Sequence, residues 1–298
     1  RPGMVVGMEE PGYPDARNIF SLKSADLRVL PVAMNGIDPD DVPKDCRLLF
    51  LTPSRQCPTG VRLPFERRQR LLELAENRDM LLIEDDFESN FGLTEEASTA
   101  MRGMDGSRRV LYVGSLSQTL APGLRVGYIV GPPAIMREAR ALRRLMLRHP
   151  PTNNQRALAL FLALGHFDRL LRKSIDVLAE RADAIRSALE QHLPVFDVTC
   201  GSGGSSVWVK GPDGLDSRSL AVAAKQAGVL IEPGDVFFHG DHPPKHYCRL
   251  GFSSIPITRV DSGIEILSKI VAEEGEAPPN TDKARPCGLV LSKRRLWI

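Results

Sequence analysis

Residues 113–128 read V-G-S-L-S-Q-T-L-A-P-G-L-R-V-G-Y, a polar turn between two apolar runs. The small hydroxyl residues Ser115 and Ser117 lie close to the end of the first run, and Arg125 precedes the second. Hydroxyls and one guanidinium suit a phosphate group, because charge-assisted and bidentate hydrogen bonds offset its desolvation. The stretch therefore predicts a phosphate-binding turn at the end of a sheet strand.

Two further turns follow apolar runs nearer the start of the chain. Residues 10–16, E-P-G-Y-P-D-A, form a rigid turn that presents Tyr13 at the carboxyl edge of a sheet, where ligands bind in α/β proteins. A tyrosine on a solvent-facing turn is the alternative. Residues 52–60, T-P-S-R-Q-C-P-T-G, have the Pro and Gly of an ordinary strand-to-helix turn, but their length and polar content indicate more.

A run of acidic residues ends the apolar strand of a fourth segment, residues 81–91, L-L-I-E-D-D-F-E-S-N-F. Glu84, Asp85 and Asp86 repel one another, so such a cluster either solvates or holds a cation, a metal or a protonated ring nitrogen. Taken alone, the run fits a solvated strand end better. The order and separation of the four segments favour a binding site.

The periodicity of the first half predicts an α/β fold. Residues 1–130 alternate short apolar runs with helical stretches, the pattern of a mainly parallel sheet with crossover helices. One such helix is expected at 64–77, because Pro64 fits a first helical turn and apolar residues recur on one side. The expected strands of this half are 4–8, 27–32, 48–52, 80–84, 110–114 and 127–130.

The second half switches to helical periodicity and then to short strands. Helical stretches at 133–147 and 153–193, broken at Gly165, leave the first domain. A helix at 217–227 with strands around it indicates a smaller α+β domain, and those strands are expected at 196–199, 206–209, 229–231 and 247–252. The expected parts of the chain are a partial large domain over 1–150, linking helices and the small domain over 151–274, and a C-terminal tail over 275–298.

Composition excludes several classes of function. The 298 residues carry 39 Lys and Arg against 37 Asp and Glu, a net charge of +2, so no bulk charge favours nucleic acid or an anionic membrane. The apolar runs fall far short of the roughly 20 residues that cross a bilayer, which predicts a soluble protein without a membrane partner. The scattered, odd number of cysteines predicts reduced thiols and a cytoplasmic location. The first residues lack a signal-peptide pattern and begin at an expected strand, so we expect a fragment of a longer protein.

The cysteine and histidine patterns predict neither a disulfide framework nor a metal site. The cysteines contain no C-x-x-C pair and are widely scattered, at positions 46, 57, 200, 248 and 287. The three histidines of H-G-D-H-P-P-K-H, residues 239–246, lie in a Pro- and Gly-rich loop without the regular spacing of a metal-binding helix.

In this order the four segments resemble the pyridoxal-phosphate enzymes of the aspartate aminotransferase fold. They resemble more closely the aminotransferase-like effector domains of MocR/GabR-type regulators of the GntR family. The phrases T-P-S-x-Q-x-P-T-G, I-E-D-D-F, G-S-L-S-x-T-L-x-P-G-L-R-V-G-Y and R-H-P-P-T carry the closer match, which runs from residue 1 to about 272. The resemblance implies fold type I, with a large cofactor-binding domain. It also implies that DNA is bound only through a winged-helix domain outside this chain.

The resemblance further implies a site for pyridoxal 5′-phosphate or pyridoxamine phosphate. Tyr13 would stack on the pyridine ring, and Asp85 would pair with the ring nitrogen and keep it protonated, which makes the ring an electron sink. Ser115, Ser117 and Arg125 would hold the cofactor phosphate.

The sequence departs from the family at the residue that forms the covalent bond to the cofactor. Gln118 stands where the family has the Schiff-base lysine, and an amide neither makes that bond nor shuttles a proton. Phe87 stands where the family usually has a tyrosine that hydrogen-bonds the ring oxygen. Gln56 and Cys57 share the stretch where aminotransferases have an asparagine, and the sequence does not assign that role to either.

Three interpretations of Gln118 follow. The cofactor binds noncovalently, as pyridoxamine phosphate or as an amino-acid external aldimine; or the lysine has been replaced deliberately to trap such a complex; or the domain has lost the cofactor and kept the fold. We favour a sensing domain, because a domain that closes on a ligand tolerates the loss of turnover.

The resemblance therefore implies the ligand-binding effector domain of a MocR/GabR-type transcriptional regulator, working as a homodimer. Its ligand would be a small amino-acid-like molecule, because Arg249 matches the position that grips an amino-acid carboxylate in many aminotransferases. A structural ion pair at a strand edge is the alternative role for Arg249. The alternative function of the chain is that of a pyridoxal-phosphate-dependent aminotransferase acting on an amino acid.

Overall fold

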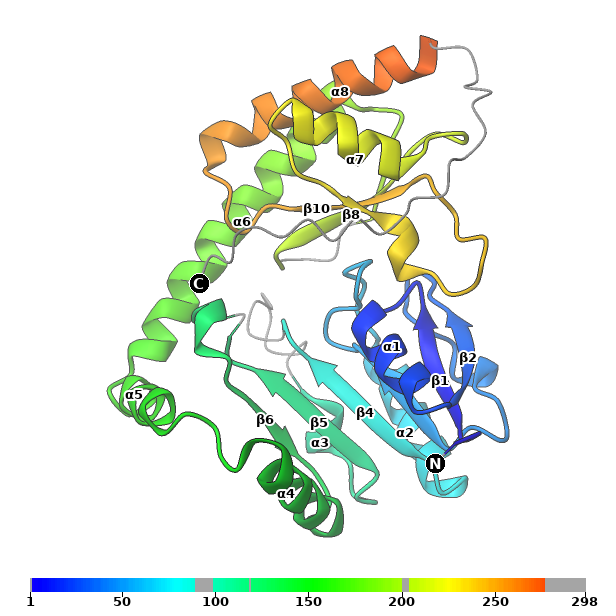
Figure 1. Cartoon of the computed structure of the whole chain (residues 1–298), viewed down its shortest axis with the longest axis vertical. Helices are drawn as coiled ribbons and strands as arrows, with labels where there is room; N and C mark the ends of the chain where they lie inside the picture. Colours follow the sequence, from blue (N-terminus) through cyan, green and yellow to red (C-terminus); the bar gives the residue numbers. More distant parts are fainter. Residues whose placement is uncertain (1, 89–98, 118, 200–203, 277–298) are drawn as a thin grey trace.

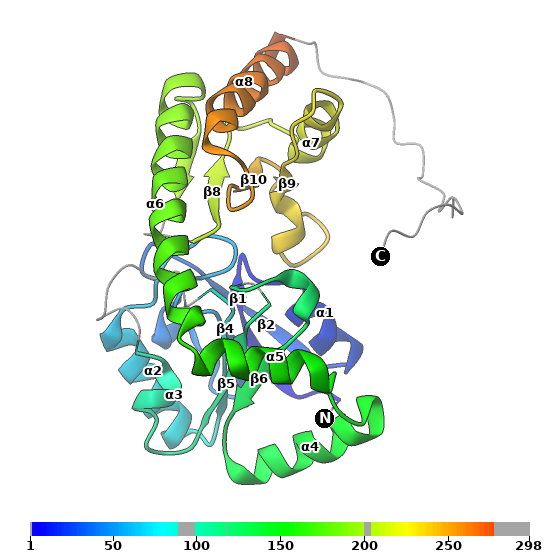
Figure 2. The same cartoon turned by 90° about the vertical axis from the view of Figure 1, so that its left-hand side faces the viewer.

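The computed structural model describes residues 2–88, 99–117, 119–199 and 204–276. These residues form two sheets, one above the other in Figure 1. A long helix, α6 (His166–His192), runs from beside the large sheet to the side of the small one (Figure 2).

The large sheet is mainly parallel, as the alternation of apolar runs and helices predicts. Its strand order is β2-β1-β3-β4-β5-β6; the first five strands in the chain run parallel, and β6 is antiparallel to β5. Parallel strands end at a common edge, where α/β proteins bind ligands. The strands are β1 (Val5–Glu10), β2 (Asp26–Pro31), β3 (Leu48–Leu51), β4 (Leu81–Asp86), β5 (Val110–Ser115) and β6 (Gly127–Val130).

The alternation of side chains along β3 shows why this sheet is covered on both faces. Leu49 and Leu51 are fully buried on the side of α2 (Phe65–Asn77), where they join Leu71 of that helix. Phe50 points the other way and joins the cluster under α1 (Pro14–Leu22). A strand buried on both faces reads as a continuous apolar run, which is why these strands are visible in the sequence. A short helix, α3 (Met101–Met104), precedes β5.

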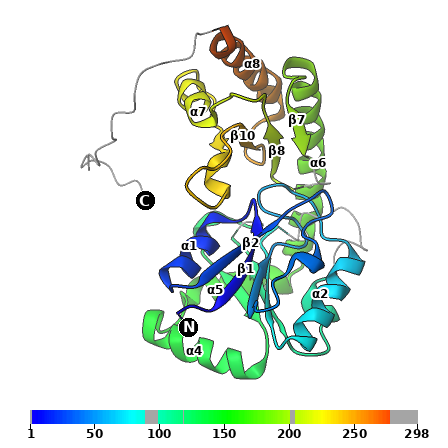
Figure 3. The same cartoon turned by 90° about the vertical axis from the view of Figure 1, so that its right-hand side faces the viewer.

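The small sheet is antiparallel, with strand order β7-β8-β10-β9. Helices cover the side that faces away from the large sheet (Figures 1 and 3). They are α6, α7 (Ser217–Gln226) and α8 (Val260–Glu276), and their apolar faces share one core with the sheet. The strands are β7 (Asp197–Thr199), β8 (Ser206–Lys210), β9 (Glu232–Pro233) and β10 (Tyr247–Gly251).

The period of two along β8 and β10 gives the small sheet two different faces. Val207 and Val209 of β8 lie in the core with the helices, so Ser206 and Trp208 point to the opposite face, toward the large sheet. Cys248 and Leu250 of β10 likewise lie in the core, which leaves Arg249 on the face with Trp208. The small sheet thus offers polar and aromatic groups to the space between the sheets.

Two further helices precede α6. They are α4 (Pro133–Leu147) and α5 (Thr152–Ala163), and Gly165 separates α5 from α6 with a φ of +70°, a conformation that glycine adopts without strain. The predicted break at Gly165 is confirmed. No residue of α4 is buried in the structure, and its Leu145 and Met146 are among the most exposed apolar side chains of the described chain.

One predicted strand is wrong in position. Residues 229–231 were expected to pair, but the short strand β9 is Glu232–Pro233. The backbone amide of Val229 instead donates to the carbonyl of Ala224, which closes the end of α7, and the side chains of Val229 and Ile231 pack against the small-sheet core. Their apolar character comes from this packing and not from strand pairing.

Two further observations concern membrane-spanning helices and cysteines in the described residues. No helix in the described residues is both long and apolar enough to cross a bilayer. Of the cysteines, Cys46, Cys57 and Cys248 are free and buried, and positions 200 and 287 lie outside the described residues.

Candidate ligand-binding site

A cavity of about 540 Å³ lies between the carboxyl edge of the large sheet and the open face of the small sheet. Besides Cys57, seven of the side chains singled out in the sequence line it, although they come from positions far apart in the chain. They are Tyr13, Asp85, Phe87, Ser115, Ser117, Arg125 and Arg249. Gln118 lies outside the described residues.

Strand alternation separates the three consecutive acidic residues of β4. Glu84 and Asp86 are buried on one face: Glu84 accepts hydrogen bonds from the backbone amides of Met101 and Arg102, and Asp86 accepts one from the hydroxyl of Tyr112 at 2.8 Å. Asp85 points the other way, into the cavity. The sequence left open whether this run is solvated or forms a binding cluster. In the structure two of the three carboxylates are buried and hydrogen-bonded, and only the third, Asp85, faces the cavity.

The Asp85 carboxylate is available to a cationic partner. Within the described residues it makes no hydrogen bond or ion pair. Burial first, and the neighbouring charge of Asp86 second, raise the pKa of its carboxyl to about 6. A protonated ring nitrogen placed beside Asp85 would relieve this unfavourable environment, since an opposite charge favours the ionised carboxylate.

Tyr13 lines the cavity from the turn between β1 and α1. Its hydroxyl donates to the Asp15 carboxylate at 3.1 Å, which holds the phenol ring in place. Burial, followed by this hydrogen bond, raises the pKa of Tyr13 to about 12, so the phenol stays neutral at physiological pH. The half-buried ring lines the cavity at the sheet edge, and an aromatic side chain is a group on which a planar ligand can stack.

The turn after β5 gathers the groups expected to bind a phosphate. Ser115 ends β5, and the hydroxyl of Ser117 closes the turn by accepting from the backbone amide of Val126 at 3.1 Å. Arg125 has a left-handed backbone, with a φ of +48°, and its side chain is exposed. A non-glycine residue in this region is uncommon and is kept where the surroundings require it. The turn thus directs two hydroxyls and one guanidinium to the same cavity.

Cys57, not Gln56, reaches the cavity from the loop after β3. The Gln56 amide holds the loop together: its nitrogen donates to the carbonyls of Pro11 and Cys57, and its oxygen accepts from Thr59. Burial raises the pKa of the Cys57 thiol to about 12, so the group is a neutral thiol and a poor nucleophile. Cys57 and Phe87 pack with Trp208 into an apolar wall.

Arg249 combines the two roles considered for it. Its guanidinium lines the cavity, and it also makes an ion pair with Glu232 at 2.9 Å and donates from Nε to the Ser206 hydroxyl at 3.0 Å. Two neighbours therefore fix the fork of the guanidinium at the cavity wall. A fixed fork is suited to bidentate recognition of a carboxylate.

The sequence reading missed some of the cavity residues. Glu232 and Phe237 both line the cavity, and both belong to the run E-P-G-D-V-F-F at residues 232–238. An acidic residue beside a Pro-Gly pair and directly before two aromatics was the available signal. No group of three or more His, Cys, Asp or Glu side chains in the described residues could hold a metal ion.

Comparisons with known proteins agree with the resemblance in the sequence. The family model described as aminotransferase class I and II matches residues 1–265. The HTH-type transcriptional regulator TauR of Rhodobacter capsulatus is 38% identical over 268 residues, which are 90% of this chain and 55% of that protein. The probable rhizopine catabolism regulatory protein MocR of Rhizobium meliloti is 33% identical, over 95% of this chain and 58% of its own length.

Solved aminotransferases share the fold. The crystal structure of Pyrococcus horikoshii kynurenine aminotransferase superposes with a TM-score of 0.86 at 28% identity, and the match covers 93% of this chain and 71% of that one. The chain spans only a little over half the length of the two regulators above.

Proposed function

Because the chain belongs to the class I and II aminotransferase family, we propose that its cavity binds pyridoxal 5′-phosphate or pyridoxamine phosphate noncovalently, and that it is the ligand-binding domain of a MocR/GabR-type transcriptional regulator. The observation that carries this proposal is that Asp85 and Arg125, which lie 40 positions apart in the sequence, line one cavity together. The identity to helix-turn-helix regulators over most of the chain supports the regulatory role.

The residues present fit the cofactor. The Asp85 carboxylate in the cavity suits a protonated ring nitrogen, and Tyr13 offers an aromatic side chain to the ring. Ser115, Ser117 and Arg125 supply the hydroxyls and the guanidinium that a phosphate requires. When bound, the protonated pyridine ring draws electrons from an attached amino acid.

The fixed guanidinium of Arg249 gives the same cavity a place for the carboxylate of an amino-acid-like ligand. Because Arg249 belongs to the small sheet and Asp85 to the large one, a ligand that touches both would favour one arrangement of the two sheets. That differential contact is what a ligand needs in order to shift a conformational equilibrium. DNA binding would then fall to a helix-turn-helix domain outside these 298 residues.

We also propose that the protein works as a homodimer. The exposed apolar side chains of α4, among them Leu145 and Met146, are suited to an interface between copies. Sedimentation equilibrium measures the mass directly. A monomer at micromolar concentration would contradict this part of the proposal.

An aminotransferase acting on an amino acid is the second candidate function, favoured by the likeness to kynurenine aminotransferase. It is weakened by Gln118, because no amine at that position is present to form the covalent bond and to move the substrate proton. The two functions differ in what the protein does with its ligand: a sensor binds it, and an enzyme turns it over.

Titration with pyridoxal phosphate separates the two. Calorimetry should show saturable binding, and absorbance spectroscopy should show no borohydride-reducible imine at residue 118 and no transfer of amino groups. The variant Gln118→Lys should gain the reducible imine, whereas Gln118→Asn should not. Absence of binding by either pyridoxal phosphate or pyridoxamine phosphate would overturn the proposal, and amino-group transfer by the unaltered chain would favour the enzyme.

A further inference from the structure

A buried ion pair lies beside the cavity, among residues that the proposed function does not use. The Nε atom of Arg55 lies 2.9 Å from a carboxylate oxygen of Glu88, and the two side chains are only 9% and 2% exposed. Both residues belong to the large domain: Arg55 lies in the loop after β3, and Glu88 follows β4 by two positions. Removing both charges of such a pair from water costs free energy, so the net contribution of the ion pair to folding stability is small.

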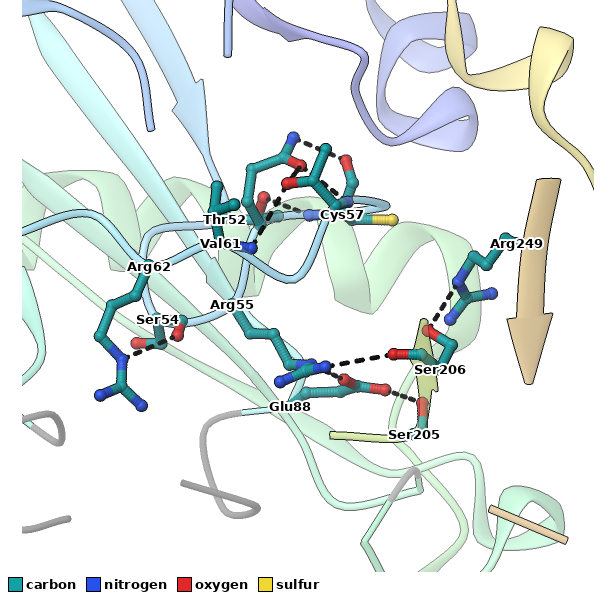
Figure 4. Close-up of polar contacts among 12 residues, drawn as sticks. Thr52, Ser54, Arg55, Cys57, Val61, Arg62, Glu88, Ser205, Ser206 and Arg249 are labelled. Atoms are coloured by element: carbon teal, nitrogen blue, oxygen red, sulfur yellow. Dashed lines mark hydrogen bonds and ion pairs between the residues drawn. The ribbon is translucent and has the colours of Figure 1, made fainter. Parts of the chain in front are cut away.

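The pair holds the beginning of β8, which belongs to the small sheet (Figure 4). The Nη2 atom of Arg55 donates to the carbonyl of Ser206 at 3.3 Å, and the hydroxyl of Ser205 donates to the Glu88 carboxylate. Gly204 makes the approach possible, because a Cβ atom at that position would lie 1.8 Å from the Cζ atom of Arg55. The two sheets are therefore joined here by charge-assisted hydrogen bonds.

The same serine that Arg55 holds also contacts Arg249. The carbonyl of Ser206 accepts from Arg55, and its hydroxyl accepts from Nε of Arg249 at 3.0 Å (Figure 4). Movement of the Ser206 backbone would therefore move the partner that orients the Arg249 guanidinium. Glu232, the other partner of Arg249 in the described part of the chain, is half-exposed and pairs with Nη1, so it does not fix the fork alone.

We propose that Arg55 and Glu88 are positioning residues that, by holding Ser206, set the Arg249 guanidinium for recognition of a ligand carboxylate. The inference rests on the proposed function, because it requires that the cavity bind a phosphopyridoxyl ligand. It adds that the affinity for the carboxylate part of the ligand depends on a buried pair that touches neither the ligand nor the cavity.

The test uses two stable probes that differ only in a carboxylate: N-(5′-phosphopyridoxyl)-L-alanine and N-(5′-phosphopyridoxyl)-ethylamine. Their dissociation constants are measured by calorimetry on the full chain. The unaltered protein should bind the alanine probe more tightly. In Arg55→Met, the affinity for the alanine probe should fall about tenfold, the scale of one lost charge-assisted hydrogen bond. The affinity for the ethylamine probe should fall less than about twofold.

Three variants complete the design. Arg55→Lys restores the charge without the fork, so it should recover only part of the affinity for the alanine probe. The double variant Arg55→Met/Glu88→Met leaves no unpaired charge and should keep the melting temperature near that of the unaltered chain, while still losing the preference for the alanine probe. Arg62→Met is the matched control, because Arg62 lies in the same loop and, within the described residues, donates only to the carbonyl of Ser54.

The outcomes separate the two proposals. Equal weakening of both probes in the folded double variant would overturn the positioning role, as would an unaltered chain that binds both probes equally. Failure of the unaltered chain to bind either probe would overturn the proposed function and this inference with it. A preference for the alanine probe that Arg62→Met keeps and the Arg55 variants lose supports the inference.

Discussion

At the scale of single residues, the charge of Asp85 makes the binding of a phosphopyridoxyl ligand depend on pH. The pKa of its carboxyl in the ligand-free cavity is about 6, so the group is neutral below pH 6 and charged above it. Only the charged form attracts a protonated ring nitrogen. The contribution of Asp85 to ligand affinity is therefore present at pH 7 and above, and it is lost as the pH falls through about 6.

The prediction concerns pyridoxamine phosphate and the variant Asp85→Asn. At pH 7.5 the unaltered chain should bind at least about tenfold more tightly than the variant, as expected for a charge-assisted contact. The ratio of the two affinities should approach one near pH 5. Using the ratio cancels the titration of the ligand phosphate, which both proteins meet equally. A ratio that stays constant from pH 5 to pH 8 would show that Asp85 does not meet the ring nitrogen.

A second residue, Glu9, ties stability to pH. Complete burial raises the pKa of the Glu9 carboxyl to about 7, against the hydrogen bonds from Thr52 and Gln56 that lower it. The folded state therefore binds a proton more readily than the unfolded state does. The stability that Glu9 contributes is fully present below pH 4.5 and is lost as the pH rises through about 7.

The gain in free energy of unfolding that Glu9→Gln gives over the unaltered chain should therefore be larger at pH 8 than at pH 4.5. The pKa difference corresponds to an increase of about 3 kcal/mol. All three hydrogen bonds to Glu9 end on one oxygen, which the amide of glutamine retains. Glu84→Gln is the matched control. Burial raises the pKa of Glu84 to about 7 as well, so this variant should show the same gain in stability with rising pH. The Glu84 carboxylate accepts a backbone amide on each oxygen, so an amide nitrogen there also loses one bond and lowers the stability by an amount that does not depend on pH. Urea unfolding at several pH values measures both variants.

The sequence identifies cavity residues that lie at strand ends, and it misses contacts made across the two sheets. Tyr13, Asp85 and Ser115 each follow an apolar run, and in a parallel sheet such positions share one edge. The pairing of Arg55 with Glu88 has no local signature, because the two residues lie in different loops. Glu232 enters the site only because β9 pairs with β10, and that two-residue strand is too short to leave a periodic pattern.

At the scale of elements, the pairing of β5 with β6 depends on a glycine. Gly114 lies opposite Tyr128 in this antiparallel pair, and a Cβ atom at Gly114 would lie 2.4 Å from the Tyr128 ring. The ring covers the strand directly before Ser115. A side chain at position 114 would therefore displace the ring from the strand that leads into the candidate phosphate turn.

Gly114→Ala should lower the free energy of unfolding by about 1 kcal/mol, the low end for overpacking, because the exposed Tyr128 ring has room to turn away. It should also weaken the binding of a phosphate-bearing probe such as pyridoxamine phosphate. Gly103→Ala is the control, because a Cβ at that position of α3 meets nothing within 4 Å and alanine favours a helix. Equal stability of the two variants in chemical denaturation would contradict the packing argument.

The elements themselves follow from burial more than from intrinsic propensity. Strands β1, β3 and β4 are predicted within a few residues because their apolar runs fill both faces of a covered sheet, whereas the apolar run of β6 is exposed. Residues 229–231 are as apolar as a buried strand, but they close the end of α7 and pack against the small-sheet core. A short apolar run in the sequence does not distinguish these two cases.

At the scale of the whole molecule, the cavity takes its walls from both sheets. Tyr13, Asp85 and the turn around Arg125 come from the large domain, whereas Phe237 and Arg249 come from the small one. The largest apolar clusters of the two sheets are separate, and a smaller cluster around Cys57, Trp208 and Phe237 joins them. Polar contacts also join the two sheets: Arg55 donates to the carbonyl of Ser206 and Arg17 to that of Val236, and a ligand in the cavity would add to these contacts.

Ligand binding should therefore change how the two domains unfold. N-(5′-phosphopyridoxyl)-L-alanine at about 100 times its Kd should stabilise the folded protein by about 2.7 kcal/mol. Because this probe is expected to touch both sheets, calorimetry should show one transition that moves to higher temperature. In Arg249→Met the same probe would lose its charged contact with the small sheet, so the transition of the large domain should move to higher temperature by more than that of the small domain. If the probe moves only one of two transitions in the unaltered chain, the cavity is not bridged by the ligand, and the closing motion on which a regulator depends has no physical cause.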